Sequence, residues 1–424
     1  MNVRITTPKT AAEATLVEQF AALRATDPDR AAAFQAFAAS GLPTRRDEAW
    51  HYTDLRSAMG VAAPLATAPD AGCIEAARTL LEARAPLGDL RLVLVDGRFV
   101  PQLSDAAPKG VLASTLAKSL PLGELDAVVS LNDVFATNGL SLLLDAGVRP
   151  EGRIEIVHLA SAGAVQAIYS RVSITLFAGA EAHIVESFLG ADAGCQRNAL
   201  TRLSLNKGAH CAHVSLIDDD AGLHLESQIA VLGDNAEFNS FAFIAGGALT
   251  RRQIFATLAG EGANLALGGL SLLDGRRHAD TTLFVDHAAP RGRSREFYKH
   301  IVAGEATGVY QGKVVVQPGA QKTDGAMKSQ AILLSPHAVM NNKPELEIFA
   351  DDVVCGHGAT VGALDPEQMF YLRTRGLPKT EAEAMLLEAF GADAIARVDD
   401  EELAELLRGK LRAWLAGRAE GARP

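Results

Sequence analysis

Near the end of the chain, two residues with the chemistry of metal ligands lie two positions apart: Cys355 and His357, with a glycine on each side of the histidine. In a strand, side chains two positions apart point to the same face. A soft sulfur beside an imidazole suits iron or zinc. Two side chains cannot hold a metal ion by themselves, so further ligands must come from elsewhere, another chain included. The alternative interpretation is a small core cysteine beside a structural histidine.

Three other segments only partly match motifs that carry chemistry. The glycines around His357 are spaced one residue too widely for a dinucleotide fingerprint, and no βαβ unit surrounds them. The segment Gly308–Val314 has three residues rather than four between its glycines, and valine where a phosphate loop has serine or threonine. His210 and His213 flank Cys211 without a second pair at zinc-site spacing, which favours a core role. We therefore expect no nucleotide site, and any ATP to be bound by a partner.

The composition limits the classes of partner. The 424 residues include 40 Lys plus Arg and 51 Asp plus Glu, a formal net charge of −11, without a long basic run. This argues against nucleic acid and against an anionic membrane. No apolar stretch reaches the roughly 18 residues of a membrane helix, and the first nine residues lack the apolar core of a signal peptide. With four scattered cysteines and no CxxC pair, the expected location is the cytoplasm.

Cys355 and His357 must be positioned by the secondary structure around them. From about residue 90, the sequence pattern that predicts this secondary structure changes. The apolar segments become short and rich in Val, Ile, Leu and Phe, which predicts strands, and no long helical patterns alternate with them. Turn-like segments recur at intervals of 29, 25, 29 and 57 residues, beginning at Gly179, Gly208, Gly233, Gly262 and Gly319. A repeat of this length made of strands alone predicts a β-helix, and glycine suits its tight corners.

The first part of the chain has helical patterns. Apolar residues between Ala11 and Leu23 follow the helical period. Asp27, followed by proline, predicts the start of a second helix that extends to about Ala39. The segment Thr44–Leu55, which groups Trp, His and Tyr, is interpreted as a knot that docks these helices.

The last part is also helical by pattern. Asp365, followed by proline, predicts a helix that Gly376 stops. Thr380 and Glu383 predict a capping box at the start of the next helix. A final helix has an apolar stripe over residues 403–415. That stripe either caps one end of the solenoid or docks a partner, and the residue pattern leaves both readings open.

Longer segments resemble one known family. REFYKHIVAGEATGVYQGKVVVQPGAQKTDGAMKSQAILLS and NNKPELEIFADDVVCGHGATVGALDPEQMFYLRTRG, with LNDVFATNGL and TRRDEAWHYTDL, resemble the SufB/SufD family of iron–sulfur cluster assembly scaffold proteins. The similarity touches most of the chain and is strongest over its last third. Within that family, the modest length and the histidine of CGHGATVG favour the SufD branch over the SufB branch.

The resemblance implies a fold that agrees with the patterns above. It is mainly β, a right-handed parallel β-helix (solenoid) flanked by N-terminal and C-terminal α-helical domains. We therefore expect an N-terminal helical domain over residues 1–88, a β-helix core over 89–364 and a C-terminal helical domain over 365–424.

The resemblance also implies a function, that of a non-enzymatic cytoplasmic scaffold subunit that pairs with a SufB paralogue and docks the ATPase SufC. His357 matches a histidine at the subunit interface where a nascent cluster forms, and Cys355 matches a neighbouring cysteine. The expected cofactor is a transient iron–sulfur cluster shared with SufB, with a part in iron acquisition, no stably bound cofactor, and ATP only through SufC. The residues expected to dock the ATPase are Phe370, Tyr371, Leu372, Arg373, Leu386 and Phe390.

Other functions require features that the sequence lacks or leaves open. A β-helix carbohydrate-active enzyme, the main alternative, needs a secretory signal, an aromatic groove and clustered carboxylates. Aromatic residues make up only 5% of the chain, and the tightest acidic cluster, Asp218–Asp220, has the pattern of a turn. A hexapeptide-repeat acyltransferase needs an apolar residue every six positions, a pattern absent here. A homodimer of the isolated chain stays open.

Overall fold

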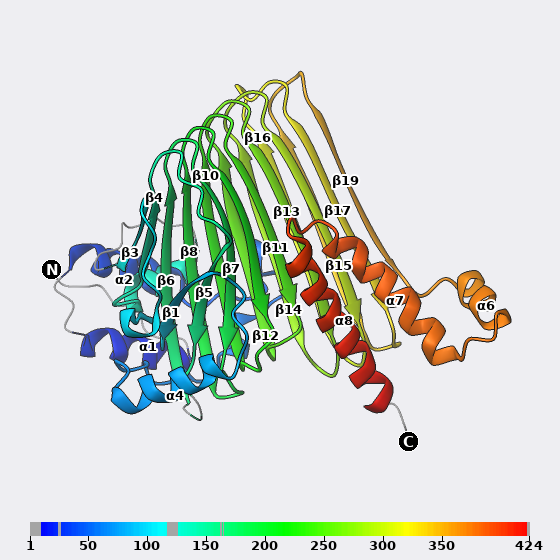
Figure 1. Cartoon of the computed structure of the whole chain (residues 1–424), viewed down its shortest axis with the longest axis horizontal. Helices are drawn as coiled ribbons and strands as arrows, with labels where there is room; N and C mark the ends of the chain where they lie inside the picture. The colour runs from blue at the N-terminus through cyan, green and yellow to red at the C-terminus, as the bar shows by residue number, and fades with distance from the viewer. Residues whose placement is uncertain (1–9, 24–26, 117–125, 162, 164, 422–424) are drawn as a thin grey trace.

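The computed structural model describes residues 10–23, 27–116, 126–161, 163 and 165–421. Within them the chain is mainly β, and it winds through two facing sheets so that successive turns stack into a parallel β-solenoid with helices at both ends of the sequence (Figure 1). This confirms the predicted fold class. No helix among the described residues is both long and apolar enough to cross a membrane.

Each turn of the solenoid contributes one strand to each sheet. Sheet I contains, in spatial order, β2 (Arg98–Phe99), β1 (Leu90–Val95), β5 (Arg153–Leu159), β7 (Glu181–Leu189), β9 (His210–Ile217), β11 (Glu237–Ile244), β13 (Asn264–Leu273), β15 (Arg293–Val302), β17 (Asp324–Leu333) and β19 (Val354–Gly362). Sheet II contains β3 (Val111–Thr115), β4 (Leu140–Leu144), β6 (Gln166–Leu176), β8 (Cys195–Leu205), β10 (Leu223–Leu232), β12 (Leu249–Leu258), β14 (His278–His287), β16 (Thr307–Val316) and β18 (Val339–Ile348).

The two ends of the solenoid differ. At the beginning, β2 pairs with β1 and β3 with β4 in antiparallel fashion, so a reversed strand closes each sheet. The later pairs are parallel, through to β17 with β19 and β16 with β18. The core lies between the sheets, where Leu, Ile, Val and Ala side chains of successive turns stack.

The predicted repeat is present, but its corners are set by backbone conformation rather than by a Gly-Ala pair. Each strand of sheet I from β7 to β17 begins two residues after a residue with positive φ: Gly179, Gly208, Asn235, Gly262, Arg291 and Lys322. Gly233 and Gly319 lie in the expected corners, yet the left-handed residues there are Asn235 and Lys322. The corner at Arg291 was not predicted, because neither arginine nor lysine signals a left-handed conformation.

The N-terminal helices cover parts of both sheets. They are α1 (Ala11–Ala22), α2 (Pro28–Ser40), the 3-10 turn η1 (Glu48–Trp50), α3 (Leu55–Ala58) and α4 (Ala71–Glu82). Asp27 caps α2 as predicted, with Pro28 at the first helical position. A further helix, α5 (Ala127–Phe135), and the turn η2 (Pro101–Leu103) lie inside the region expected to be β-helix. Apolar residues of α1, α2 and α5 share one cluster with Leu223 and Leu225 of β10, whereas α4 packs on β1 and β5 of sheet I.

The Thr44–Leu55 segment is a docking knot, as predicted. Trp50 is buried, its ring lies 3.7 Å from the guanidinium of Arg251, and its Nε1 donates to Asp126 over 2.9 Å. Arg251 forms a buried ion pair with Asp280 over 2.5 Å, and the Thr53 hydroxyl also donates to that carboxylate. The knot thus joins the helices to strands β12 and β14.

The C-terminal helices are α6 (Pro366–Thr374), α7 (Lys379–Ile395) and α8 (Glu401–Gly421), and α7 and α8 pack on the outer face of sheet I (Figure 1). The apolar stripe of α8 packs there with Leu270 and Leu272, rather than over an end of the solenoid. The helix start at Asp365 is confirmed. The predicted capping box is wrong, because α7 begins earlier, at Lys379, with Pro378 as its N-cap and no side-chain cap.

Candidate metal site at the open end of the solenoid

The C-terminal end of the solenoid is open. Strands β18 and β19 are the last strands of their sheets, and each has a hydrogen-bonded neighbour on one side only. Several large apolar side chains are exposed here, namely Val339, Ile348, Phe349, Val354 and Val361. An unpaired strand edge with exposed apolar residues is a template for association with another chain. We call this surface, formed by β18, β19 and the turn between them, the open end.

Cys355 and His357 lie together on β19 at the open end. Their partners on β17 are Gly325 and Met327, and Met327 belongs to the core between the sheets. The two side chains therefore share the inner face of the strand, which confirms the prediction that they point the same way. Cys355 is half-buried, whereas His357 is exposed because no further turn follows β19. Burial, with the carboxylates of Asp324 and Glu296, raises the pKa of the Cys355 thiol.

These two residues form an incomplete ligand set. Among the described residues, no group of three or more His, Cys, Asp or Glu side chains is arranged to hold a metal ion. A half-buried sulfur and an exposed imidazole on one face of an edge strand can still supply two ligands to iron. The remaining ligands would have to come from whatever covers the open end.

The residues expected to dock an ATPase lie on α6 and α7. Phe370 and Tyr371 are 70% and 57% exposed, Arg373 is exposed, Leu372 is half-buried, and α6 has no buried residue. Figure 1 shows α6 projecting away from the solenoid. On α7, Leu386 and Phe390 are half-buried, and the Phe390 ring lies 4.2 Å from the Lys299 ammonium of β15. Phe390 thus also helps to seat α7 on sheet I.

A groove of about 650 Å³ lies between α6, α7, α8 and the end of β17. Its walls are largely apolar and include Leu334, Leu364, Met369, Phe370 and Leu387. Only three residues, 363–365, separate the end of β19 from the start of α6. The strand with Cys355 and His357 is therefore directly joined to the most exposed helix of the chain.

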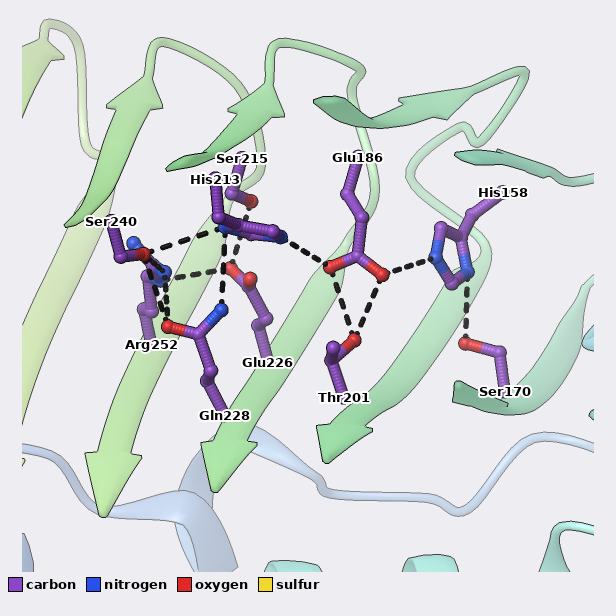
Figure 2. A network of polar contacts seen from close by, with 10 residues as sticks. All are labelled: His158, Ser170, Glu186, Thr201, His213, Ser215, Glu226, Gln228, Ser240 and Arg252. Atoms are coloured by element: carbon purple, nitrogen blue, oxygen red, sulfur yellow. Dashed lines mark hydrogen bonds and ion pairs between the residues drawn. The ribbon is translucent and has the colours of Figure 1, made fainter. Parts of the chain in front are cut away.

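Sequence reasoning did not anticipate a polar network in the middle of the solenoid core (Figure 2). Glu186 is fully buried and accepts hydrogen bonds from Thr201 at 2.8 Å and from His213 at 3.1 Å, and His158 lies 3.4 Å away. These partners hold the pKa of Glu186 well below its usual range despite burial. The network therefore stabilises the ionised carboxylate inside the core.

The network continues toward the next turns. Arg252 pairs with Glu226 at 3.3 Å and donates to Ser240 at 3.0 Å and to Gln228 at 3.2 Å. Ser240 in turn donates to Gln228. In Figure 2 these side chains point toward one another from both sheets. Most of these mid-core groups bond to one another, as buried polar groups usually do, although among the described residues one Glu226 oxygen and two Arg252 nitrogens have no hydrogen-bond partner.

Closer to the open end, buried polar groups lack such partners. Within the described part of the chain, no hydrogen-bond partner is found for either carboxyl oxygen of Glu296, for the hydroxyls of Ser294, Tyr298 and Tyr310, or for either ring nitrogen of His300. Burial raises the pKa of Glu296 to about 7 and lowers that of His300 to about 3. The strand alternation of Ser294, Glu296 and Tyr298 in the sequence could have signalled these inward-facing groups.

Comparison with known proteins identifies the family. The family model described as "SUF system FeS cluster assembly, SufBD core domain" matches residues 158–390, more than half of the chain. The chain belongs to the SufB/SufD family. The iron-sulfur cluster assembly protein SufD of Escherichia coli is 32% identical over 389 residues, which cover 90% of this chain and 91% of that protein. This supports the SufD branch that the sequence motifs favoured.

Other members of the SufB/SufD family are also similar. A SufBD family protein of Synechocystis is 26% identical over 414 residues, covering 89% of this chain and 87% of that protein. The chloroplastic protein ABCI7 of Arabidopsis thaliana is 30% identical over 251 residues, covering 58% of this chain and 52% of that protein. Membership in this family places the chain in iron–sulfur cluster assembly as a SufD homologue.

Proposed function

We propose that this chain is a non-enzymatic scaffold subunit of a Suf complex, and that its open end pairs with a SufB paralogue. The exposed edges of β18 and β19 and the apolar residues beside them support this, because a second β-solenoid could extend both sheets. A homodimer of the isolated chain through the same surface stays an open alternative.

In this proposal His357 and Cys355 face the partner and contribute ligands to a nascent iron–sulfur cluster. The observation that carries it is their shared position on the inner face of the last strand, where a covering chain completes the ligand set. A neutral imidazole and a thiolate are the ligand forms that bind iron, so assembly would release protons and depend on pH. The cluster is cargo, and the chain catalyses no covalent turnover.

We further propose that α6 and the adjacent groove dock the ATPase SufC, through Phe370, Tyr371, Leu372 and Arg373, with Leu386 and Phe390 on α7. Exposed aromatic residues beside an arginine have the composition of interface anchors. The three-residue connection to β19 means that force on α6 reaches the strand with His357 directly.

The test of the function is the iron and acid-labile sulfide content of the complex co-expressed with SufB and SufC and purified without oxygen. His357→Ala is expected to leave the complex intact but to lose most of the cluster. The matched control is His337→Ala, which removes an exposed histidine from the corner between β17 and β18. Full cluster content in the His357 variant would make this residue structural, and failure of the wild-type chain to join the complex would refute the assignment.

A further inference from the structure

The last strands of the two sheets differ at their free edges, the sides on which β18 and β19 have no hydrogen-bonded neighbour. Successive residues of a strand direct their backbone N–H and C=O groups to opposite sides. The N–H of Val339 donates to Ala306 over 3.0 Å, and that of Phe349 donates to Val316 over 2.9 Å. The register with β16 is continuous between these bonds. The residues of β18 that direct their backbone groups to the free edge are therefore Met340, Asn342, Pro344, Leu346 and Ile348.

Pro344 interrupts this row of backbone groups at the middle of β18. Proline has no backbone N–H, and its ring occupies the place where a donor would point. A strand laid along the free edge of β18 would therefore meet a ring instead of a hydrogen-bond donor opposite Pro344. Proline on an edge strand is one of the features by which proteins prevent another strand from pairing there.

Charged side chains on β18 act in the same direction. Met340 and Leu346 pack against the core, so the residues that alternate with them lie on the outer face of the strand. Three of these outer residues are charged, namely Lys343, Glu345 and Glu347. Lys343 forms an ion pair with Glu345 at 3.2 Å. Charges along an edge strand also disfavour the addition of a further strand.

The free edge of β19 has neither feature. The N–H of Val354 donates to Thr323 over 2.9 Å, and the register with β17 is continuous. The strand contains no proline and no Asp, Glu, Lys or Arg, and its outer face is largely glycine. Another strand can therefore approach β19 along its whole length. The residues whose N–H and C=O groups it would meet are Cys355, His357, Ala359 and Val361.

The interruption on β18 lies opposite one of the candidate metal ligands. A Cβ atom at Gly312 would lie 2.5 Å from the sulfur of Met327, so these two residues face each other across the core. Pro344 is in register with Gly312, and His357 with Met327. Pro344 and His357 thus occupy the facing positions of the last turn.

We propose that Pro344 makes the open end one-sided, so that a partner solenoid adds its last strand along β19, while pairing along β18 is interrupted opposite His357. This rests on the proposed function, in which the open end receives another chain of the same family. The beginning of the solenoid is closed by antiparallel strands, so two such chains can join their sheets only open end to open end. One solenoid is then turned around, and the added strand runs antiparallel to β19.

This arrangement has a consequence for the candidate metal site. The added strand would hold the backbone of Cys355 and His357 through hydrogen bonds on β19. The seam on the side of sheet II would be held less tightly, since Pro344 supplies no donor there. The ligand residues would thus be fixed by one edge, with the other edge left free to open.

The first test uses the isolated full-length chain and needs no partner. Pro344→Thr restores an N–H at the free edge with a residue suited to strands. Two copies that meet at their open ends would each gain a donor. We therefore expect the dissociation constant for self-association, measured by sedimentation equilibrium, to fall by about tenfold.

The matched control is Asn341→Thr on the same strand. Its N–H points to β16, so the substitution adds strand propensity without a donor at the free edge. We expect its dissociation constant to equal that of the wild type. No tightening in Pro344→Thr, or equal tightening in both variants, would overturn the proposal.

The second test locates the added strand in the wild-type complex with SufB by hydrogen–deuterium exchange and mass spectrometry. Relative to the isolated chain, the peptide spanning β19 is expected to exchange about a hundredfold more slowly, and the peptide spanning β18 to change much less. Equal or greater slowing in β18 would contradict the proposal. A chain that does not join SufB would instead refute the proposed function, and the self-association of Pro344→Thr would still decide the role of the proline.

Discussion

At the scale of single residues, two buried acids of the same core, Glu186 and Glu296, have different hydrogen-bonding surroundings. Glu186 is ionised and surrounded by donors from Thr201 and His213. Glu296, four turns further along, lies between leucine and methionine and has no hydrogen-bond partner among the described residues. The first arrangement stabilises a unique core, whereas the second is destabilising when the group is charged. Among the described residues, buried polar atoms without a hydrogen-bond partner include those of a run of neighbours from Ser294 to Tyr310 toward the open end, and others of Glu226 and Arg252 in the mid-core.

The difference can be measured as a pH dependence of stability. Burial raises the pKa of Glu296 from 4.5 to about 7, so the folded state binds this proton more tightly than the unfolded state. The cost is absent below pH 4.5, grows as pH rises to about 7, and is constant above. Glu296→Gln should therefore raise the free energy of unfolding by about 3 kcal/mol at pH 8 and about 2 kcal/mol at pH 6. Urea unfolding at both pH values checks this, and a gain independent of pH would contradict it.

At the scale of elements, left-handed residues fix where each strand of sheet I begins. Gly, Asn, Arg and Lys all occupy the equivalent corner position, with φ between 51° and 72°. Glycine adopts this conformation without strain, while other residues require support from neighbouring turns. The corners are therefore held by the stacking of turns as much as by their own residues.

Two corner glycines that look alike in the sequence are therefore expected to differ in how well they tolerate substitution by alanine. Gly262→Ala should destabilise the fold by about 1–2 kcal/mol, because φ is +72° and the new Cβ would lie 2.6 Å from Asn235 Oδ1. Gly319→Ala should change stability by less than about 0.5 kcal/mol, since its added Cβ meets nothing within 4 Å. Thermal or urea unfolding of both variants measures the two changes in stability. Equal losses of stability would show that the sequence repeat, rather than a positive φ, marks the corners.

The helix α6 offers a second test at this scale. Phe370→Ala together with Tyr371→Ala should leave the unfolding free energy within about 0.5 kcal/mol of wild type, since both side chains are largely exposed. Loss of two aromatic anchors should weaken SufC binding by about 2 kcal/mol, roughly thirtyfold. Leu80→Ala, an exposed apolar residue on α4, is the matched control. Calorimetric titration measures the affinity for SufC. An unchanged affinity would show that the docking site does not include these two side chains.

At the scale of the whole molecule, the solenoid is closed at one end and open at the other. Antiparallel strands close its beginning, the knot around Trp50 joins the N-terminal helices to sheet II, and α7 and α8 brace sheet I from outside. Lys299 pairs with Asp393, and Arg153 with Asp400. Among the described residues these attachments leave the outer edges of β18 and β19 uncovered, which is the surface proposed above to pair with another chain.

The long core also makes the whole fold sensitive to acid. Burial lowers the pKa of His224 and His300 to about 3 and that of His287 to about 4. Below pH 6.5 the unfolded chain binds protons that the folded chain does not, so stability present at neutral pH is lost as pH falls. Each of these histidines should lower the free energy of unfolding by about 2 kcal/mol at pH 5 relative to neutral pH. Urea midpoints should fall steeply between pH 6.5 and 5, and His300→Phe should reduce the fall, while an unchanged slope would argue against a neutral buried imidazole.

The sequence by itself determined the local features of this protein. Strand alternation placed Cys355 and His357 on one face, the Asp-Pro pairs marked the starts of α2 and α6, and the repeat indicated a solenoid. Each of these features depends on residues a few positions apart or on a regular spacing along the sequence. The longer motifs also indicated the family that the comparisons identified.

Only the tertiary structure decided what depends on contacts between distant segments. It showed that α8 packs on sheet I rather than at the solenoid end, that Asn235 and Lys322 rather than Gly233 and Gly319 turn the corners, and that α5 lies within the β region. It also brought Cys355, Gly325 and Ser294 into register across three strands. Register between strands about 30 residues apart is set by the stacking of whole turns, which no local pattern encodes.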